Sequence, residues 1–112
     1  MSRAYDMSIE LEGFSPSRAD AIRVVLYEEW TIEDELCHQG TWALWGKGSL
    51  LNVEREEEFA DRIARAVMTA NGGPCVVRIL ATNLENAPRT LYTRNRDDYA
   101  RLVVEQDRLE DA

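Results

Sequence analysis

The sequence is poor in the residues that most often carry chemistry or cross-links. It holds two cysteines, one histidine and a single lysine among 112 residues. Two cysteines are too few for a disulfide framework, which favours a reducing compartment. No apolar run approaches the roughly 18 residues that a membrane-spanning helix needs, and residues 1–6 lack the apolar core of a signal peptide. We therefore expect a cytoplasmic protein that does not enter a membrane.

Positive charge is also scarce. The chain carries 13 Lys and Arg against 21 Asp and Glu, a net charge of −8. The acidic excess lies in residues 1–61, with 5 basic and 14 acidic side chains, whereas residues 62–112 carry 8 basic and 7 acidic ones. A general duplex-binding protein needs a basic face against the phosphates, so this balance disfavours that class. It favours solubility and a basic protein partner.

The apolar residues follow two regular periods. Every second residue from Tyr5 to Leu11 is apolar, which predicts a strand with one face in water. Other stretches have helical spacing, with proline or polar caps at their starts and glycine or proline at their ends. The predicted elements are helices at about 17–29, from 56 to a stop at 71–74, and after Asn95; a hairpin of 33–38 with 41–50; and strands at 75–82 and 89–93.

This order of elements predicts the fold. The sequence runs β-α-β-β-α-β and then adds a strand and a helix, without an internal repeat or a linker. We expect an α+β protein of ferredoxin-like βαββαβ plan, a two-layer sandwich with two helices on one face of an antiparallel sheet. Residues 1–112 are predicted to form one domain with a frayed acidic tail from about residue 107.

The strand predicted at 41–50 places two tryptophans on opposite faces of the sheet. Trp42 is expected in the core, and Trp45 on the face without the two helices. Either Trp45 marks a dimer or ligand surface, or the C-terminal helix covers it. If it is exposed, Trp45 is a good interface anchor, with Glu33, Asp34 and Glu35 as charges that steer a partner.

Two patterns resemble chemical sites but fit them poorly. Cys37 and His38 are neighbours on a predicted strand, where adjacent side chains point to opposite faces, and Cys75 is the only further thiol. They lack the spacing of a zinc site, so no metal site is predicted. Gly46-Lys47-Gly48-Ser49 departs from a phosphate-binding loop, because Gly48 stands where Ser or Thr is required. A glycine-flanked strand end or bulge accounts for it better.

A basic and aromatic group lies near the end of the chain. Arg89, Tyr92, Arg94 and Arg96 surround the last predicted strand. Such a group suits single-stranded nucleic acid, through stacking and phosphate contacts. The aromatic run of RNA-binding βαββαβ domains is missing from Val76 to Asn83, so this is kept only as an alternative.

The second half of the chain resembles a group of small bacterial proteins. The residues that carry the resemblance are Glu57-Glu58-Phe59-Ala60, Ala70-Asn71-Gly72-Gly73-Pro74-Cys75, Ala81-Thr82-Asn83-Leu84-Glu85 with Pro88, and Tyr92 with Asp97-Asp98-Tyr99. They are similar to uncharacterised proteins of phages, plasmids and other mobile elements. The resemblance implies a bacterial setting and carries over no activity.

The sequence favours a small acidic, non-enzymatic protein–protein interaction module of regulatory or inhibitory character. It contains no credible catalytic constellation and implies no cofactor, while Trp45 and the acidic first half suit binding to a basic protein or to a second copy through the open sheet face. Three alternatives remain: a mobile-element protein that blocks a host nucleic-acid-binding complex, a small metal-dependent or thiol enzyme, and a single-stranded nucleic-acid binder.

Overall fold

The computed structural model describes residues 3–51, 53–86 and 88–105, so the tail predicted to fray from about 107 lies outside the described residues. It is an α+β structure with one five-stranded antiparallel sheet. The elements are β1 (Arg3–Glu12), a 3₁₀ turn (Pro16–Arg18), α1 (Ala19–Glu29), β2 (Asp34–His38), β3 (Thr41–Leu50), α2 (Glu56–Asn71), β4 (Val76–Asn83), β5 (Arg89–Arg94) and α3 (Arg96–Tyr99), which continues as a π-helical turn over Ala100–Val104.

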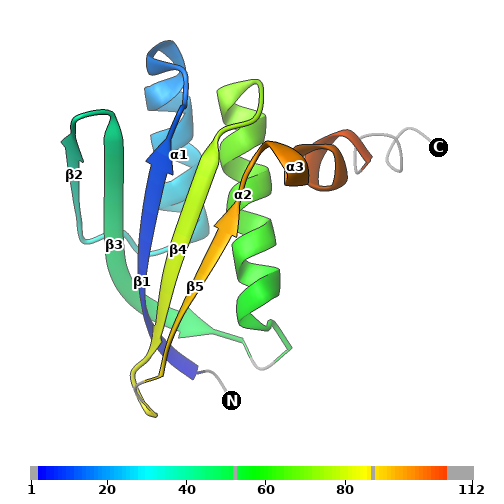
Figure 1. Ribbon diagram of the computed structural model, residues 1–112. Helices are drawn as coiled ribbons and strands as arrows, with labels where there is room; N and C mark the ends of the chain where they lie inside the picture. Colours follow the sequence, from blue (N-terminus) through cyan, green and yellow to red (C-terminus); the bar gives the residue numbers. More distant parts are fainter. Residues whose placement is uncertain (1–2, 52, 87, 106–112) are drawn as a thin grey trace.

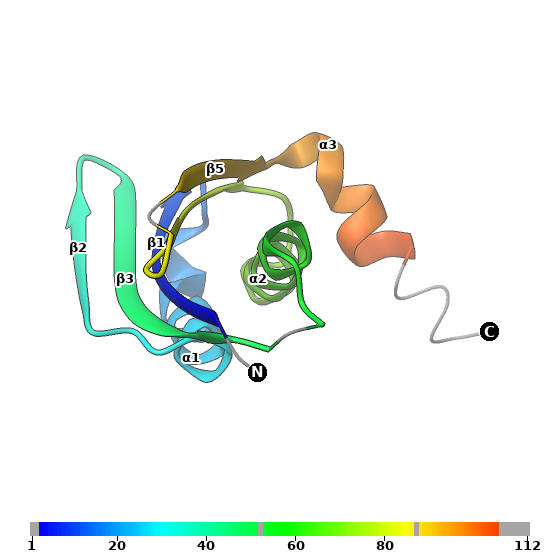
Figure 2. The ribbon, with the colours of Figure 1, turned by 90° about the horizontal axis from the view of Figure 1, so that it is seen from below.

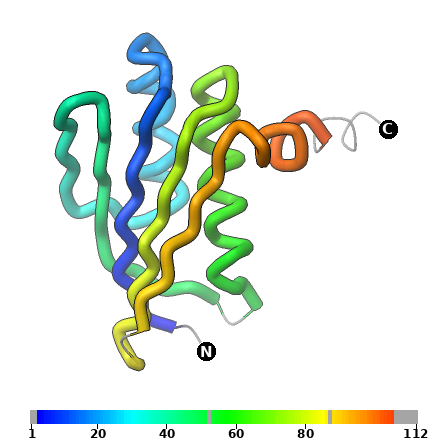
Figure 3. Tube along the Cα trace, in the orientation of Figure 1, coloured from blue at the N-terminus to red at the C-terminus, as the bar shows by residue number. Residues whose placement is uncertain are grey.

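The strands follow the order β2-β3-β1-β4-β5 across the sheet, and every neighbouring pair is antiparallel (Figures 1 and 3). The strand β1 is central and is hydrogen-bonded on both sides, to β3 and to β4. The predicted hairpin of 33–38 with 41–50 is confirmed, with Gln39 and Gly40 in the left-handed region at its turn. The two outer strands, β2 and β5, each have one unpaired edge within this sheet.

Both long helices lie on the same side of the sheet. Seen along the molecule from below, the sheet curves around α2, with α1 beside it and α3 beyond β5 (Figure 2). The core fills the space between these two layers. Along β1 every second residue is buried, so Tyr5, Met7, Ile9 and Leu11 are at most 1% exposed, as the alternation predicts.

The helix ends differ in how they are capped. Asn71, at the end of α2, accepts a hydrogen bond from the Ser15 backbone N–H at 2.7 Å, so the chain enters α1 through a contact with the other helix. Ser15 itself makes no side-chain cap, and α1 begins at Ala19 rather than at about residue 17. Gly72 ends α2 in the left-handed conformation (φ 76°), as the sequence predicts.

Arginines join the elements on the helix side. Arg62 of α2 bonds to Glu54 and to Glu29, and it also donates to the Glu29 carbonyl at the end of α1. The carboxylate of Asp61 accepts from Arg94 of β5 at 2.7 Å and from Arg101 at 3.0 Å. These groups hold α1, α2, β5 and the C-terminal helix together.

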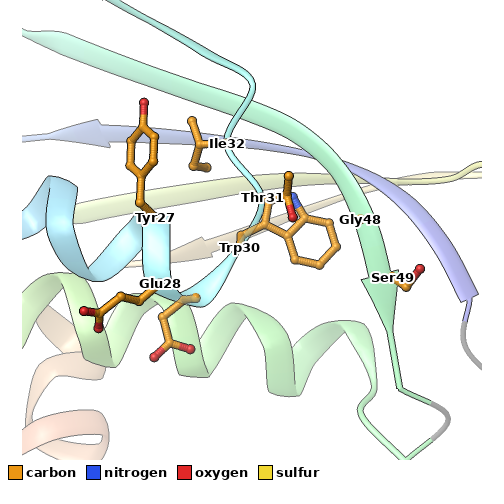
Figure 4. A pocket seen from close by; sticks show the side chains of 8 residues that line it. Tyr27, Glu28, Trp30, Thr31, Ile32, Gly48 and Ser49 are labelled. Atoms are coloured by element: carbon orange, nitrogen blue, oxygen red, sulfur yellow. The ribbon is translucent and has the colours of Figure 1, made fainter.

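Gly46 and Gly48 lie inside β3, and this corrects the expectation of a strand end or bulge. The pairing with β1 runs through both positions without an extra residue. The glycines make room for the chain after α1, because the indole N–H of Trp30 donates to the Gly46 carbonyl at 2.9 Å and its ring lies against Gly48 (Figure 4). A Cβ on Gly46 would stand 1.9 Å from the Thr31 carbonyl oxygen, and one on Gly48 would stand 2.9 Å from the indole.

No helix in the described part of the chain is long and apolar enough to cross a lipid bilayer.

Substitution of the two strand glycines tests this packing. We expect Gly46→Ala and Gly48→Ala each to lower the free energy of unfolding by about 1–3 kcal/mol or more, because a new methyl group overpacks the contact with Thr31 or Trp30. Gly73→Ala is the matched control, since a Cβ there meets nothing within 4 Å, and we expect a change within about 0.5 kcal/mol. Urea unfolding measures all three; equal effects at Gly73 and Gly46 would contradict the account.

Two tyrosines share one carboxylate and make the fold sensitive to alkali. Tyr5 and Tyr92 both donate to Glu56, the latter at 2.8 Å. Burial, followed by the bond to Glu56, raises the pKa of Tyr92 to about 12, and the same causes raise the pKa of Tyr5. Folding therefore favours the neutral, protonated form of both tyrosines over the charged tyrosinate. Their contribution is complete below the ordinary pKa of about 10 and is lost as the pH rises toward about 12.

The absorbance of tyrosinate is measured against pH for the native protein and for Tyr92→Phe, and the difference between the two curves reports Tyr92. We expect this difference to titrate near pH 12 in the folded protein and near pH 10 in concentrated urea. The urea midpoint of the native protein should fall across the same interval, and less steeply in Tyr92→Phe. Titration of Tyr92 near pH 10 in the folded protein would refute this environment.

Candidate interaction surface

The side of the sheet opposite α1 and α2 is called the open face below. Directly paired residues on neighbouring strands share a face, so the strand registers define its members. They are Ala4, Asp6, Ser8, Glu10 and Glu12 of β1; Asp34, Leu36 and His38 of β2; Thr41, Ala43, Trp45, Lys47 and Ser49 of β3; Val76, Arg78, Leu80 and Thr82 of β4; and Arg89, Leu91 and Thr93 of β5.

A row of four residues, three of them large and apolar, crosses this face from β3 to β5. Trp45 pairs with Ser8, Ser8 with Leu80, and Leu80 with Leu91, and these four residues are the central row. Trp45 and Leu80 are partly exposed, and Leu91 is 59% exposed. Leu36, at the other edge, is 61% exposed. Exposed apolar side chains that adjoin one another, as Leu80 and Leu91 do, are less common than single ones on a surface that faces only water.

Beside the central row runs a band of charged side chains. Arg78 bonds to Glu10 at 3.4 Å and to Glu12 at 2.6 Å, and Glu12 also accepts from the Thr41 hydroxyl at 2.9 Å. The bonds from Arg78 and then Thr41 lower the pKa of Glu12. Because these groups satisfy one another within the sheet, the band is already organised before any partner arrives.

A hollow of about 280 Å³ lies on the open face beside Ser8. Ser8, Glu10, Arg78, Leu80 and Leu91 line it. The hollow thus lies over β1, β4 and β5, and the partly exposed Trp45 stands on the other side of Ser8, on β3.

Trp45 lies on the open face, and Trp42 lies in the core, 3% exposed. The alternative in which the C-terminal helix covers Trp45 is wrong for the described residues. That helix packs on the other side of the sheet: Leu102 belongs to the core, and its carbonyl accepts from Arg65 of α2 at 2.8 Å. The last turn of the described chain therefore leaves the central row accessible.

The three acids expected to steer a partner do not share one face. Asp34 pairs directly with Trp45 on the open face. Glu33 precedes β2 and accepts from the Lys47 backbone N–H at 3.3 Å. Glu35 points to the helix side, where Arg23 at 2.9 Å and Tyr27 at 2.9 Å donate to it. Of the three, Asp34 is beside Trp45, while Glu35 holds β2 to α1. The bond from Arg23 is the first cause of the lowered pKa of Glu35.

The group considered for nucleic acid is divided between two faces. Arg89 lies on the open face, whereas Tyr92 and Arg94 point to the helix side and bond to Glu56 and Asp61. Arg96 is exposed at the start of α3. These four side chains therefore do not form one continuous surface.

The two cysteines and the histidine also remain apart. Cys37 pairs with Trp42 and faces the helix side, His38 pairs with Thr41 on the open face, and Cys75 is buried before β4. Among the described residues no three His, Cys, Asp or Glu side chains are grouped to hold a metal ion. Cys37 lines a hollow of about 350 Å³ together with Phe14, Trp42, Arg23 and Glu35.

The sequence predicts Trp45 but not its companions in the central row. Leu80 and Leu91 lie on strands whose alternation is visible, yet only the register brings them level with Trp45. The sequence signal that could have indicated this is the pair of adjacent apolar residues Leu91 and Tyr92, because neighbouring strand residues face opposite sides of the sheet.

No protein-family model, curated protein or solved structure matches this chain. The resemblance of its second half to proteins of mobile elements therefore stays a prediction, and the geometry of the open face carries the functional argument.

The thiols offer a test of this arrangement. Burial raises the pKa of Cys75 to about 11, so at pH 8 its thiolate is scarce and enclosed, whereas Cys37 is exposed. We expect a disulfide reagent to modify one thiol per native chain quickly and the second only after unfolding in urea. Cys37→Ser should remove the fast phase. Two equally fast thiols in the folded protein would contradict the burial of Cys75.

Proposed function

We propose that the protein is a non-enzymatic protein-binding module and that the open face is its binding surface. The observation that carries the proposal is the central row, which has three large apolar side chains on the side of the sheet that the described helices leave uncovered. A two-layer α+β structure needs only one face of its sheet for its own core, so apolar residues in register on the second face call for another explanation.

Trp45 is the proposed anchor of this surface. It is partly exposed and stands between Asp34 on β2 and Ser8 on β1. Tryptophan provides the largest apolar area of any side chain with few rotatable bonds, and it is enriched among the residues that dominate binding energies. Leu36 and Leu91, both more than half exposed, extend the apolar contact toward the two edges of the sheet.

Charge plays a smaller part in this proposal than the composition suggests. The open face carries the acids Asp6, Glu10, Glu12 and Asp34 and the bases Lys47, Arg78 and Arg89, so its charges nearly cancel although the chain has a net charge of −8. The acidic excess belongs to the other parts of the molecule. Apolar area, rather than attraction to a strongly basic protein, is therefore the proposed source of affinity.

We also propose that residues 3–83 have the ferredoxin-like plan. The strand order β2-β3-β1-β4 with antiparallel neighbours, and one helix between β1 and β2 and another between β3 and β4, support it. The strand β5 and the C-terminal helix are additions to this plan. The two thiols are free, with Cys37 on β2 and Cys75 just before β4, and this supports a reducing compartment such as the cytoplasm.

Affinity capture tests the proposed surface. The tagged chain is incubated with a native lysate that also contains an untagged copy of the chain, at low and at high salt, and bound proteins are identified by mass spectrometry. We expect a stoichiometric partner that survives high salt, because apolar contacts are not screened. Trp45→Ala should lose that partner, since removal of an interface anchor costs about 2 kcal/mol or more.

Val24→Ala is the matched control, because Val24 is 57% exposed on α1, on the other side of the sheet. It should capture the partner as the native chain does. Capture that is unchanged by Trp45→Ala, or equally lost in Val24→Ala, would refute the open face as the binding surface.

A further inference from the structure

We propose that the free edge of β5 binds an extended segment of a partner protein, which adds to the sheet as an antiparallel strand and carries a carboxylate opposite Arg89. The inference goes beyond the proposed function, because it concerns an edge of the sheet rather than its open face. Main-chain hydrogen bonds give affinity to a contact of this kind, and the side chains opposite one another give it specificity. Three features of the described residues support the proposal: the free main-chain groups of β5, the contrast with the other edge, and the local charge.

The first feature is the set of main-chain groups that β5 turns outward. The Asn83 N–H donates to the Pro88 carbonyl at 3.1 Å, at the start of the β4–β5 ladder. Hydrogen-bonded and non-hydrogen-bonded pairs alternate in an antiparallel ladder. The residues of β5 that bond to β4 are therefore Thr90, Tyr92 and Arg94. The residues that turn their N–H and carbonyl groups away from β4 are Arg89, Leu91 and Thr93.

These outward groups are accessible. Leu91 is 59% exposed, and Thr90 is exposed although it faces the helix side, so the helices do not cover this edge. The C-terminal helix begins beyond the end of β5 and turns toward α2 (Figures 1 and 2). The Thr93 carbonyl accepts from the Arg94 guanidinium at 3.0 Å. Within the described residues, three N–H groups and two carbonyls of β5 thus remain for a further strand.

The second feature is the contrast with β2, the other outer strand of the sheet. Three successive acids stand at the start of β2, and the carboxylate of one of them, Asp34, accepts from the Glu35 main-chain N–H at 2.8 Å. Charged side chains are one device by which proteins prevent unwanted pairing at an edge. Between its two terminal arginines β5 is uncharged, with the sequence Thr90-Leu91-Tyr92-Thr93. Threonine and tyrosine favour strands, so β5 is the edge that suits pairing.

The third feature is the charge at this edge. Residues 89–96 carry three arginines and no acid, in a chain with a net charge of −8. Arg94 is bound by Asp61, whereas Arg89 and Arg96 make no ion pair within the described residues. A carboxylate directly opposite Arg89 forms a favourable cross-strand pair, and an apolar side chain does so opposite Leu91. Because the rest of the chain repels acids, one carboxylate at this position fits better than a strongly acidic segment.

Selection from a phage library of random seven-residue peptides tests the edge, with the native protein as bait. We expect the enriched peptides to share an apolar residue followed two positions later by Asp or Glu. An antiparallel strand then places these two side chains opposite Leu91 and Arg89, on the same face of the sheet. One enriched peptide is synthesised, and its dissociation constant is measured with the native protein and with the variants below.

Thr93→Pro is the decisive variant. It removes an outward N–H but no bond to β4, and proline is tolerated at such positions of an edge strand. We expect the peptide to bind about tenfold more weakly or worse. Thr93→Ala is the matched control, because it keeps the N–H and should bind as the native protein does. Arg89→Glu should weaken binding about fivefold, and circular dichroism checks that each variant is folded.

Methylation of the peptide main chain gives a second readout. In an added antiparallel strand, the residue opposite Leu91 donates its N–H to β5, and the next residue points its N–H away. An N-methyl group at the first position should abolish binding, and one at the second should leave it nearly unchanged. Equal effects at the two positions would show that the peptide does not bind as a strand.

The inference is overturned if no peptide is enriched on the native protein, or if the enriched peptides bind Thr93→Pro as tightly as the native chain. Trp45→Ala separates this edge from the open face. Binding that depends on Thr93→Pro and not on Trp45→Ala supports the edge, and the capture experiment then decides the open face independently. Peptides that lose their binding in Trp45→Ala but not in Thr93→Pro would refute the edge and leave the open face as the binding surface.

Discussion

The alternation of apolar and polar residues along β1 is the constraint on which the rest of the structure depends. This strand is hydrogen-bonded on both sides, so its register fixes the face of every other strand. Its apolar set lies under α1 and α2, and its polar set, Asp6, Ser8 and Glu10 among them, forms the middle of the open face. A slip of one residue would exchange the two sets, at the cost of the whole core. The open face is thus a direct consequence of the same pattern that builds the core.

The helix side uses its charged groups internally. Three groups of ion pairs join different elements of the chain: Arg23 with Glu35, Arg62 with Glu29 and Glu54, and Arg94 with Asp61. Four of the 21 acids, Glu29, Glu35, Glu54 and Asp61, therefore join elements of the fold. Ion pairs thus fasten the helix layer, while the opposite surface presents tryptophan and leucine between nearly balanced charges.

Much of the fold could be predicted from local patterns, and the exceptions have physical reasons. The hairpin, both long helices and the opposite orientations of Trp42 and Trp45 follow from periodicity, which is a local property. The contacts of Trp30 with Gly46 and Gly48 could not be predicted, because they depend on the path that the chain takes between α1 and β2. Register and packing between distant segments also decide three other features. These are the position of Glu35 on the helix side, the placement of Leu102 in the core and the alignment of Leu80 with Trp45.

The most direct test of the central claim is to follow the three tryptophan indole N–H resonances by NMR while a protein captured by the native chain is added. The indoles of Trp30 and Trp42 are enclosed, and they donate to the Gly46 carbonyl at 2.9 Å and to Glu35 at 3.3 Å. Only Trp45 lies on the open face. If the open face is the binding surface, the Trp45 resonance shifts as the partner is added while the other two stay constant. A Trp45 resonance that does not change while the partner binds would contradict the account.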